Sequence, residues 1–345
     1  MASSRLFYFG VEIELLMGSK KSKHSTWKSL ASEVAKKLAK AGIDNHINES
    51  GDKSPDVYTK WSIAPEVTIP GQPAKGLYGL ELVSPVYPSD WTWAADLDVI
   101  FSVLHSSFTV VESGNCSTHV HVSTYPPLEA DELATLGKAI LYFEPALDAL
   151  VPKGRRGSTA YWCQSNRANP VLKGRRTLAE CFVAVDEAVA AAAMAAMTLS
   201  SSPSSSSDGG SSNSGGDAGR EAVVAALNMF PASSAYGRAH RKKHDFVRGK
   251  VYKWDLTGLC SARGTVEFRQ PPGSLSAGQA VGWVSLALSF VEGSLRGDTP
   301  WFLDGDGADF EDGAPVERLW EVLCDGAEGL GLGVAGISDV FATRK

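Results

Sequence analysis

The stretch FGVEIELL at residues 9–16 alternates apolar residues with carboxylates, a pattern typical of a half-buried β-strand. Successive side chains of a strand point to opposite faces. The apolar residues of the stretch would therefore pack into a core, while Glu12 and Glu14 would share the other face. The stretch predicts a strand with one core face and one acidic face.

Two distant stretches have the same alternation. HVHV places His119 and His121 on one face of a strand, and VEFR does the same for Glu267 and Arg269. Each pair alone is compatible with a solvated sheet face, but three such stretches with no Lys or Thr among them favour a functional face. Glutamate and histidine together suit hard or borderline divalent cations. Arginine adds a fork for a carboxylate or a phosphate.

The remaining patterns predict an α+β fold. Several strand-like runs follow one another without an intervening helix, which favours a largely antiparallel sheet over a doubly wound parallel one. Apart from the three stretches above, the strand-like runs are 57–69, 79–83, 108–111 and 251–256. Helical spacing is found at 27–42, 93–104, 131–150, 177–197, 221–229, 277–291 and 315–323, and Pro145 should shorten the third of these helices.

Composition excludes several classes of protein. The chain has 345 residues, of which 43% are hydrophobic and 21% charged, values typical of a folded globular protein. A net charge of −6 gives no basic excess, so neither a nucleic acid nor a membrane is expected as a partner. Five scattered cysteines without CxxC spacing fit reduced thiols. No secretion signal is evident, and the most apolar run, 188–197, is shorter than a bilayer span. We therefore expect a cytoplasmic protein.

Other charged residues are compatible with either a functional role or an ordinary surface position. Glu81 is a single carboxylate inside an apolar strand-like run. Arg155 and Arg156 follow a predicted helix and would suit a phosphate, although an exposed charged loop is the more common explanation.

Five blocks in order resemble the amidoligases. They are FGVEIEL at 9–15, KWSIAPEVTI at 60–69, GLELVSP at 79–85, NCSTHVHVS at 115–123 and RGTVEFRQPPGSL at 263–275. That family is similar in fold to glutamine synthetase and glutamate–cysteine ligase. The resemblance spans most of residues 5–290. It implies a curved antiparallel sheet with helices on its outer face, and a concave face that holds ATP, divalent metals and the acceptor carboxylate.

The resemblance also implies residue roles. The expected metal ligands are Glu12, Glu14, Glu81, His119 and Glu267. The expected catalytic residues are Arg269, Glu267 and His121, although either histidine would serve as metal ligand or phosphate contact. The expected nucleotide contacts are Arg155, Arg156 and Arg263. This chain differs from the family pattern in having Glu66 and Thr68 after Trp61, and Asp255 where an asparagine is usual.

The resemblance sets the expected domains. Residues 1–295 would form the catalytic domain, and residues 296–345 a C-terminal extension packed on it. Residues 198–219 are almost entirely Ser, Gly, Asp and Asn, which predicts a disordered insertion between two helices.

The expected activity is an ATP- and Mg²⁺-dependent carboxylate–amine ligase, with Mn²⁺ as an alternative metal. It would join a small-molecule or peptide carboxylate to an amine in an amide or isopeptide bond, through an acyl phosphate. Two alternatives stay open: a metal-dependent hydrolase that uses the two histidines, and a nucleotide-binding module without turnover.

Overall fold

The computed structural model describes residues 5–50, 58–90, 92–200, 214–240, 246–296 and 313–342. Its main sheet consists of β1 (Leu6–Ser19), β2 (Asn45–Ile47), β3 (Trp61–Pro65), β4 (Tyr78–Val83), β5 (Tyr87–Pro88), β6 (Phe108–Val111), β7 (Thr118–Tyr125), β10 (Trp254–Asp255) and β11 (Val266–Phe268). A separate hairpin is formed by β8 (Met229–Pro231) and β9 (Phe246–Arg248).

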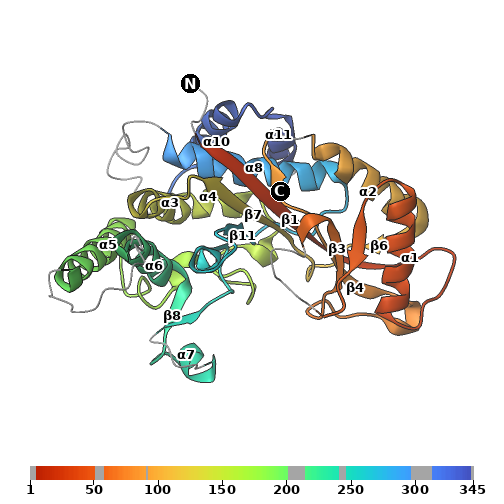
Figure 1. Cartoon of the computed structure of the whole chain (residues 1–345), viewed down its shortest axis with the longest axis horizontal. Helices are drawn as coiled ribbons and strands as arrows, with labels where there is room; N and C mark the ends of the chain where they lie inside the picture. Colours follow the sequence, from red (N-terminus) through yellow and green to blue (C-terminus); the bar gives the residue numbers. More distant parts are fainter. Residues whose placement is uncertain are drawn as a thin grey trace, which may run out of the picture.

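The described helices are α1 (Trp27–Lys40), α2 (Ala94–Ser107), α3 (Ala130–Tyr142), α4 (Glu144–Ala149), α5 (Leu178–Ser200), α6 (Ser214–Asn228), α7 (Ala235–His240), α8 (Ala277–Leu295), α10 (Val316–Leu330) and α11 (Ala335–Ala342). Figure 1 shows them arranged around the long strand β1, with α5 and α6 at one end of the molecule and α1 at the other.

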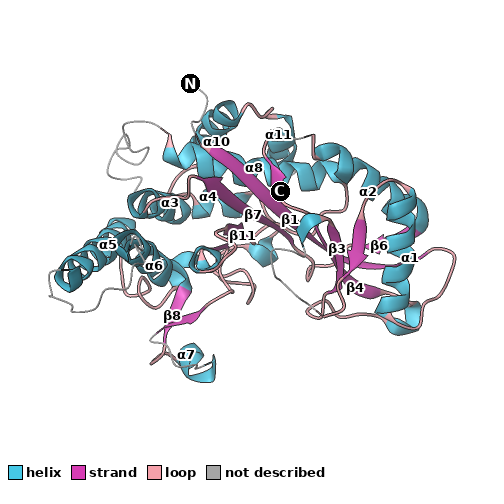
Figure 2. Cartoon of the chain, viewed as in Figure 1, coloured by secondary structure: helices cyan, strands magenta, loops and turns pink. Residues whose placement is uncertain are grey.

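The main sheet has the strand order β10-β11-β7-β1-β4-β3-β2, and β5 and β6 also pair with β1. Each of these pairs is antiparallel except β2 with β3. The predicted mixture of helices with a largely antiparallel sheet is thus confirmed (Figure 2). The long β1 lies between β4 and β7, so the FGVEIELL stretch is in the centre of the sheet.

One face of the sheet forms the core. Except for the exposed Leu6 at its start, the apolar residues of β1 that face the core are buried, as are those of its neighbours; they include Val11, Ile13, Leu15, Leu82, Val120 and Phe268. Helices α1, α2 and α8 pack on this face. α10 and α11 in turn pack on α8, in one continuous hydrophobic cluster. Gly293 and Gly326 allow this close packing, because a Cβ at either position would lie about 2 Å from a carbonyl oxygen of the other helix.

Several predicted boundaries were wrong. Strand structure occupies only residues 61–65 of the run 57–69 and only 254–255 of the run 251–256. Pro145 does shorten its helix, because α3 ends at Tyr142 and α4 begins at Glu144. The expected insertion is shorter than predicted: α5 continues to Ser200 and α6 begins at Ser214, because the two helices pack against each other. Residues 201–213 of that insertion lie outside the described residues.

The apolar run in helix α5 is longer than the predicted run of residues 188–197. Its segment Leu178–Thr198 is long and apolar enough to cross a membrane, by length and composition alone, and 22% of the apolar window is buried. One such helix is weak evidence for a membrane span. Cys181 and Val185 on the same helix pack in the core against the rest of the protein.

Candidate functional site

The three patterned stretches lie on the neighbouring strands β1, β7 and β11. Three register pairs carry the polar groups: Glu12 opposite His119, His121 opposite Glu267, and Glu14 opposite Glu81 on β4. Residues directly opposite one another in an antiparallel pair point to the same face. The register therefore gathers all of these side chains on the face away from α8.

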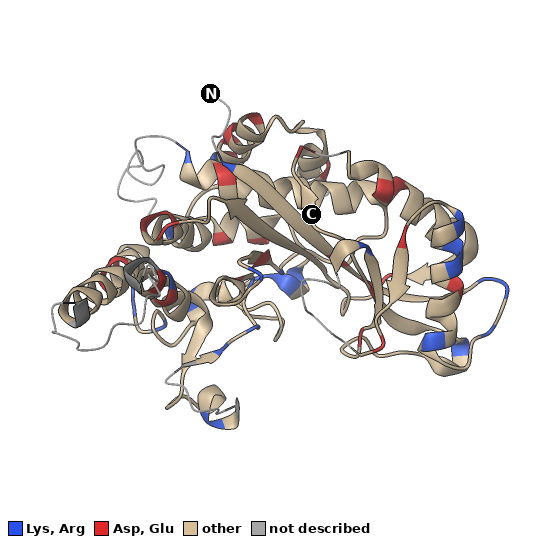
Figure 3. Cartoon of the chain, in the orientation of Figure 1, with Lys and Arg blue, Asp and Glu red and all other residues tan. Residues whose placement is uncertain are grey.

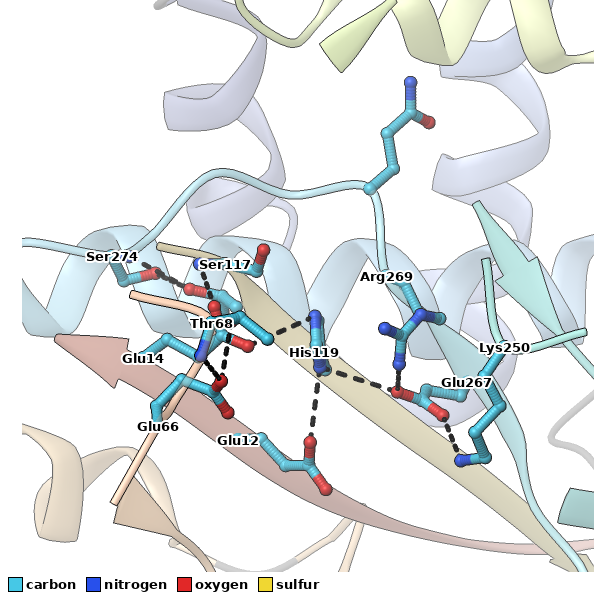
Figure 4. A network of polar contacts seen from close by, with 12 residues as sticks. Glu12, Glu14, Glu66, Thr68, Ser117, His119, Lys250, Glu267, Arg269 and Ser274 are labelled. Carbon is cyan, nitrogen blue, oxygen red and sulfur yellow. Dashed lines mark hydrogen bonds and ion pairs between the residues drawn. The ribbon is translucent and has the colours of Figure 1, made fainter. Parts of the chain in front are cut away.

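A first group of possible ligands is formed by Glu12, His119 and Glu267, whose ligand atoms all lie within 4.8 Å of one another. The Nδ1 atom of His119 is 3.2 Å from Glu12 Oε2 and 3.5 Å from Glu267 Oε1. Figure 4 shows His119 between the two carboxylates. His121 approaches the same pair, with its Nε2 atom 3.1 Å from Glu12 Oε1 and 3.8 Å from Glu267 Oε1.

A second group, with the same 4.8 Å limit, contains Glu14, Glu66 and Glu81. The backbone N–H of Ser117 donates to Glu14 Oε2 at 2.7 Å. Glu66 Oε1 accepts from both the N–H and the hydroxyl of Thr68, at 2.7 and 2.6 Å. The two groups adjoin, because His119 Nε2 is 3.8 Å from Glu14 Oε1. We call Glu12, Glu14, Glu66, Glu81 and Glu267 the acidic cluster.

Gly79 of β4 allows the loop with Glu66 to reach this position. The N–H of Glu66 donates to the Gly79 carbonyl at 3.1 Å. A Cβ at Gly79 would lie 2.6 Å from the carbonyl oxygen of Glu66 and 2.8 Å from a side-chain atom of Ile69. Any larger residue at Gly79 would therefore displace the loop and separate Glu66 from Glu14.

Two cations border the acidic cluster. The guanidinium of Arg269 donates through Nη1 to Glu267 Oε1. Lys250 Nζ lies 3.5 Å from Glu267 Oε2 and 3.7 Å from Asp255 Oδ2. Asp255 Oδ2 and Arg269 Nε are buried, and neither has a hydrogen-bond partner within the part of the chain that the structure describes. Such groups are costly to bury unsatisfied, which is expected where a polar ligand completes the bonding.

The electrostatics of the two groups differ. Burial opposes the ionised form of Glu12, but His121 and His119 outweigh it and hold the pKa of Glu12 well below its usual range. Burial also opposes ionisation of Glu267, yet Arg269, His121 and Lys250 lower the pKa of that carboxyl. In the second group, burial raises the pKa of Glu14, and the nearby Glu66 carboxylate adds to the effect. His119 lowers this pKa only in part, so burial and like charge prevail in the second group.

These donors fit Mg²⁺ or Mn²⁺. Five buried or half-buried carboxylates meet one histidine in the two groups, and hard divalent cations prefer oxygen ligands. The raised pKa of Glu14 comes first from burial and then from the neighbouring Glu66 carboxylate, and a bound cation would lower it. The cavity beside the acidic cluster has a volume of about 240 Å³. Arg263 and Trp162 line it together with the clustered carboxylates, Lys250 and Arg269. We call it the acidic cavity.

Comparison with known proteins identifies the family. A family described as "Putative amidoligase enzyme" matches residues 6–181, about half of the chain. The chain belongs to the amidoligase family. Membership makes this protein an enzyme of the ligase type. The match includes Glu12, Glu14, Glu81 and His119, whereas β11 with Glu267 lies beyond it.

Other comparisons add little. No curated protein matches the chain significantly. A solved structure described as "Apo GmaS without ligand" is similar over 99% of this chain and 68% of its own, at 12% sequence identity. The TM-score of 0.33 is too low to establish a shared fold.

The three arginines expected at the nucleotide have different surroundings in this amidoligase. Arg155 is buried and donates to the Gln270 carbonyl at 2.7 Å, to the Arg269 carbonyl at 3.1 Å and to the Ser117 hydroxyl at 2.7 Å. It therefore holds in place the segment that follows β11. Arg156 donates Nε to the Val151 carbonyl at 2.8 Å, and it does not line the acidic cavity.

Arg263 is the arginine of this set with an uncommitted side chain. Among the described residues its guanidinium has no ion pair or hydrogen bond, and it borders the acidic cavity. The nucleotide role of all three arginines stays a prediction. For the two histidines, the structure places His119 between both groups of carboxylates and His121 against Glu12, Glu267 and Thr265.

Lys250 was not predicted from the sequence as a site residue, and Glu66 and Asp255 were not assigned to the site. A signal existed for Glu66, since Glu66 and Thr68 alternate directly after a strand. Asp255 lies opposite Glu267 in the register of β10 and β11, which local sequence does not show. Lys250 precedes the strand in a turn and has no pattern of its own. Cys116 is close to the cluster, but burial and Glu14 raise the pKa of its thiol to about 11, so it is a poor nucleophile.

Proposed function

We propose that this amidoligase is an ATP- and Mg²⁺-dependent carboxylate–amine ligase, with Mn²⁺ as an alternative metal, and that its domain corresponds to the catalytic domain of glutamine synthetase. It would activate a carboxylate as an acyl phosphate and transfer the acyl group to an amine. The observation that carries the proposal is the acidic cluster, two adjoining groups of carboxylates with Arg269, Lys250 and Arg263 at the border of one cavity.

The residue types follow from the chemistry. A carboxylate is a poor electrophile, and its phosphorylation brings this anion close to the negatively charged triphosphate of ATP. Divalent cations held by Glu12, His119 and Glu267, and by Glu14, Glu66 and Glu81, would screen this repulsion. Because all six side chains stand on or beside a rigid sheet, their positions are preorganised.

The positively charged side chains of the site would stabilise the phosphoryl group during its transfer. Arg269 is held against Glu267 and extends from the end of β11 toward the acidic cavity, where its fork would bind the transferring phosphoryl group. Lys250 lies beside the other carboxylate oxygen of Glu267, Oε2, and would bind a second phosphate oxygen. Burial opposes the charged form of His121, but Glu267 and Glu12 raise its pKa, so His121 adds a proton donor beside them.

The donor set also bears on the alternatives. A zinc hydrolase would use two or three nitrogen or sulfur ligands on one metal. Here His119 is the one histidine in either group, and carboxylates supply the rest. This supports Mg²⁺ or Mn²⁺ and hence phosphoryl transfer over a zinc-activated water.

The test uses hydroxylamine as a generic amine. The full-length protein is incubated with ATP, Mg²⁺, hydroxylamine and pools of carboxylic acids, including amino acids and peptides. The carboxylate oxygen attacks the γ-phosphorus and releases ADP; hydroxylamine then displaces phosphate, which gives one hydroxamate and one phosphate per ADP. We expect acid-dependent ADP and hydroxamate in equal amounts.

Two outcomes would contradict the proposal. Retention of zinc with hydrolysis that is independent of ATP would support the hydrolase. Tight ATP binding without ADP formation, for any acid in the pools, would support a nucleotide-binding module.

A further inference from the structure

A second cavity adjoins the acidic cavity and differs from it in chemistry. It has a volume of about 200 Å³, and most of its exposed wall is apolar. Val83, Val86 and Ala262 contribute to this wall, and Gly10 of β1 forms part of its floor. Glu12 and Arg263 line both cavities, so they mark the junction. We call this space the apolar cavity.

The polar groups of the apolar cavity are mostly committed to the protein. Glu12 is held by both histidines at 3.1 and 3.2 Å. The Ser84 hydroxyl accepts from the Val11 N–H at 2.9 Å and donates to the Pro85 carbonyl at 2.7 Å. Arg263 is different, since its guanidinium has no partner among the described residues.

An apolar space with one uncommitted guanidinium at its mouth fits an amphipathic anion. Arginine binds a carboxylate through two parallel hydrogen bonds. A ligand whose carboxylate binds Arg263 would present that carboxylate at the junction, beside Glu12, while its apolar part filled the cavity. An empty apolar cavity of about 150 Å³ accommodates a benzene ring. The apolar cavity therefore has room for a short branched chain or one ring.

We propose that the apolar cavity binds the acid substrate, and that this substrate is a monocarboxylate with a short branched or aromatic side chain. The proposal rests on the proposed ligase function, because it assigns the acid of that reaction. It makes Gly10 the residue that sets the permitted size of the side chain and Arg263 the residue that orients the carboxylate.

Gly10 offers a clean way to test the size limit. It shares the face of Glu12 on β1, and a Cβ built there has the Ser84 hydroxyl, at 3.8 Å, as its nearest neighbour within 4 Å. An added Cβ would thus narrow the cavity without a clash against the backbone. Gly278 of α8 is a matched control, because it is exposed and a Cβ there meets nothing within 4 Å.

The first measurement is direct binding. Ligand-observed NMR titrations use 3-methylbutanoate, benzoate, acetate and glutarate with wild-type protein and with Gly10→Val, Gly10→Ala, Arg263→Met and Gly278→Ala. We expect 3-methylbutanoate and benzoate to bind wild type and Gly278→Ala best. Arg263→Met should weaken both about 10-fold or more, the scale of hydrogen bonds between charged groups. Gly10→Val should weaken 3-methylbutanoate about 10-fold and acetate much less, with Gly10→Ala between them and serving as the variant if Gly10→Val misfolds.

The second measurement separates this inference from the proposed function. ATP affinity is measured for the same variants, and hydroxamate formation is measured with the same acids. Absence of binding of both apolar acids to wild type, preference for glutarate, or loss of ATP affinity in Gly10→Val with unchanged acid binding would each overturn the inference. Hydroxamate formed from glutarate alone would overturn it while leaving the ligase function intact. Binding of apolar acids without hydroxamate from any acid would leave the cavity assigned and contradict the ligase function.

Discussion

Two sets of buried charges in this amidoligase differ in how they are balanced. The first is the acidic cluster. The second, which we call the lysine network, consists of Lys253 with Glu144, Asp148 and Gln270. Lys253 is 1% exposed, and its Nζ atom lies 3.1 Å from Glu144 Oε1 and 2.5 Å from Asp148 Oδ1. Gln270 donates to the same oxygen of Asp148 at 2.5 Å.

The difference separates a structural site from a binding site. In the lysine network Lys253 contacts both carboxylates, and amide donors complete their bonding: Gln270 and the Gly157 N–H donate to Asp148, and the Asn166 N–H donates to Glu144. In the acidic cluster the excess is larger, because five carboxylates adjoin the two cations Arg269 and Lys250. Figure 3 shows the lysines of α1 at the right-hand edge of the molecule; α1 packs on the core face of the sheet, opposite the acidic cluster, so these lysines do not supply the missing charge. Burial of charge alone does not mark a functional site; a large excess of carboxylates over the cations beside them does.

The substitution that should have the greatest effect removes the lysine of the lysine network. Lys253→Met removes the cation and leaves two buried carboxylates unpaired, which should lower the free energy of unfolding by about 3–5 kcal/mol. Urea denaturation followed by circular dichroism measures it. The control is Lys28→Met, which removes an exposed pair with Glu49 and should cost about 1 kcal/mol or less. A loss for Lys253→Met no greater than that of the control would show that the lysine network is not structural.

The next effect concerns the cation at the acidic cluster. Arg269→Lys keeps the charge but loses the fork, so turnover should fall by roughly 10²-fold, the scale of losing one preorganised donor. Nucleotide affinity should change much less, because the interaction forms mainly in the transition state. Steady-state kinetics and ATP titration measure the two quantities. Arg318→Lys, at an exposed pair with Glu321, is the control. A normal turnover number for Arg269→Lys would remove Arg269 from the reaction.

The smallest effect tests the excess of negative charge. Glu14→Gln should weaken Mn²⁺ binding about 10-fold or more, at least the scale of losing an outer contact of a metal site. Because the pKa of Glu14 is raised, its ionised form is disfavoured in the folded protein, so a neutral side chain should leave the free energy of unfolding of metal-free protein unchanged or higher. Calorimetry with Mn²⁺ and urea denaturation measure the two. Glu49→Gln is the exposed control. Unchanged Mn²⁺ affinity, or a large loss of stability, would show that Glu14 is structural.

The central strands and their polar face could be predicted from sequence because both depend on local alternation. Val11 and Glu12 point to opposite faces whatever strand lies beside them. The same local reasoning predicted the break at Pro145 between α3 and α4. Strand ends were predicted poorly where turns decide them, as at residues 57–69.

Local sequence is enough to show which residues share a face on each strand, since the period of two is a property of one chain segment. Which faces meet depends on how the strands pair. The register between β1, β7 and β11 places Glu12 beside His119 and Glu267, and Gly79 admits the loop with Glu66. Lys253 and Lys250 are three residues apart, yet one completes the lysine network and the other borders the acidic cluster. The partners of Lys253 are more than a hundred residues away in the sequence, and Lys250 reaches Glu267 on a strand that follows β10. Packing of the whole chain brings these partners together.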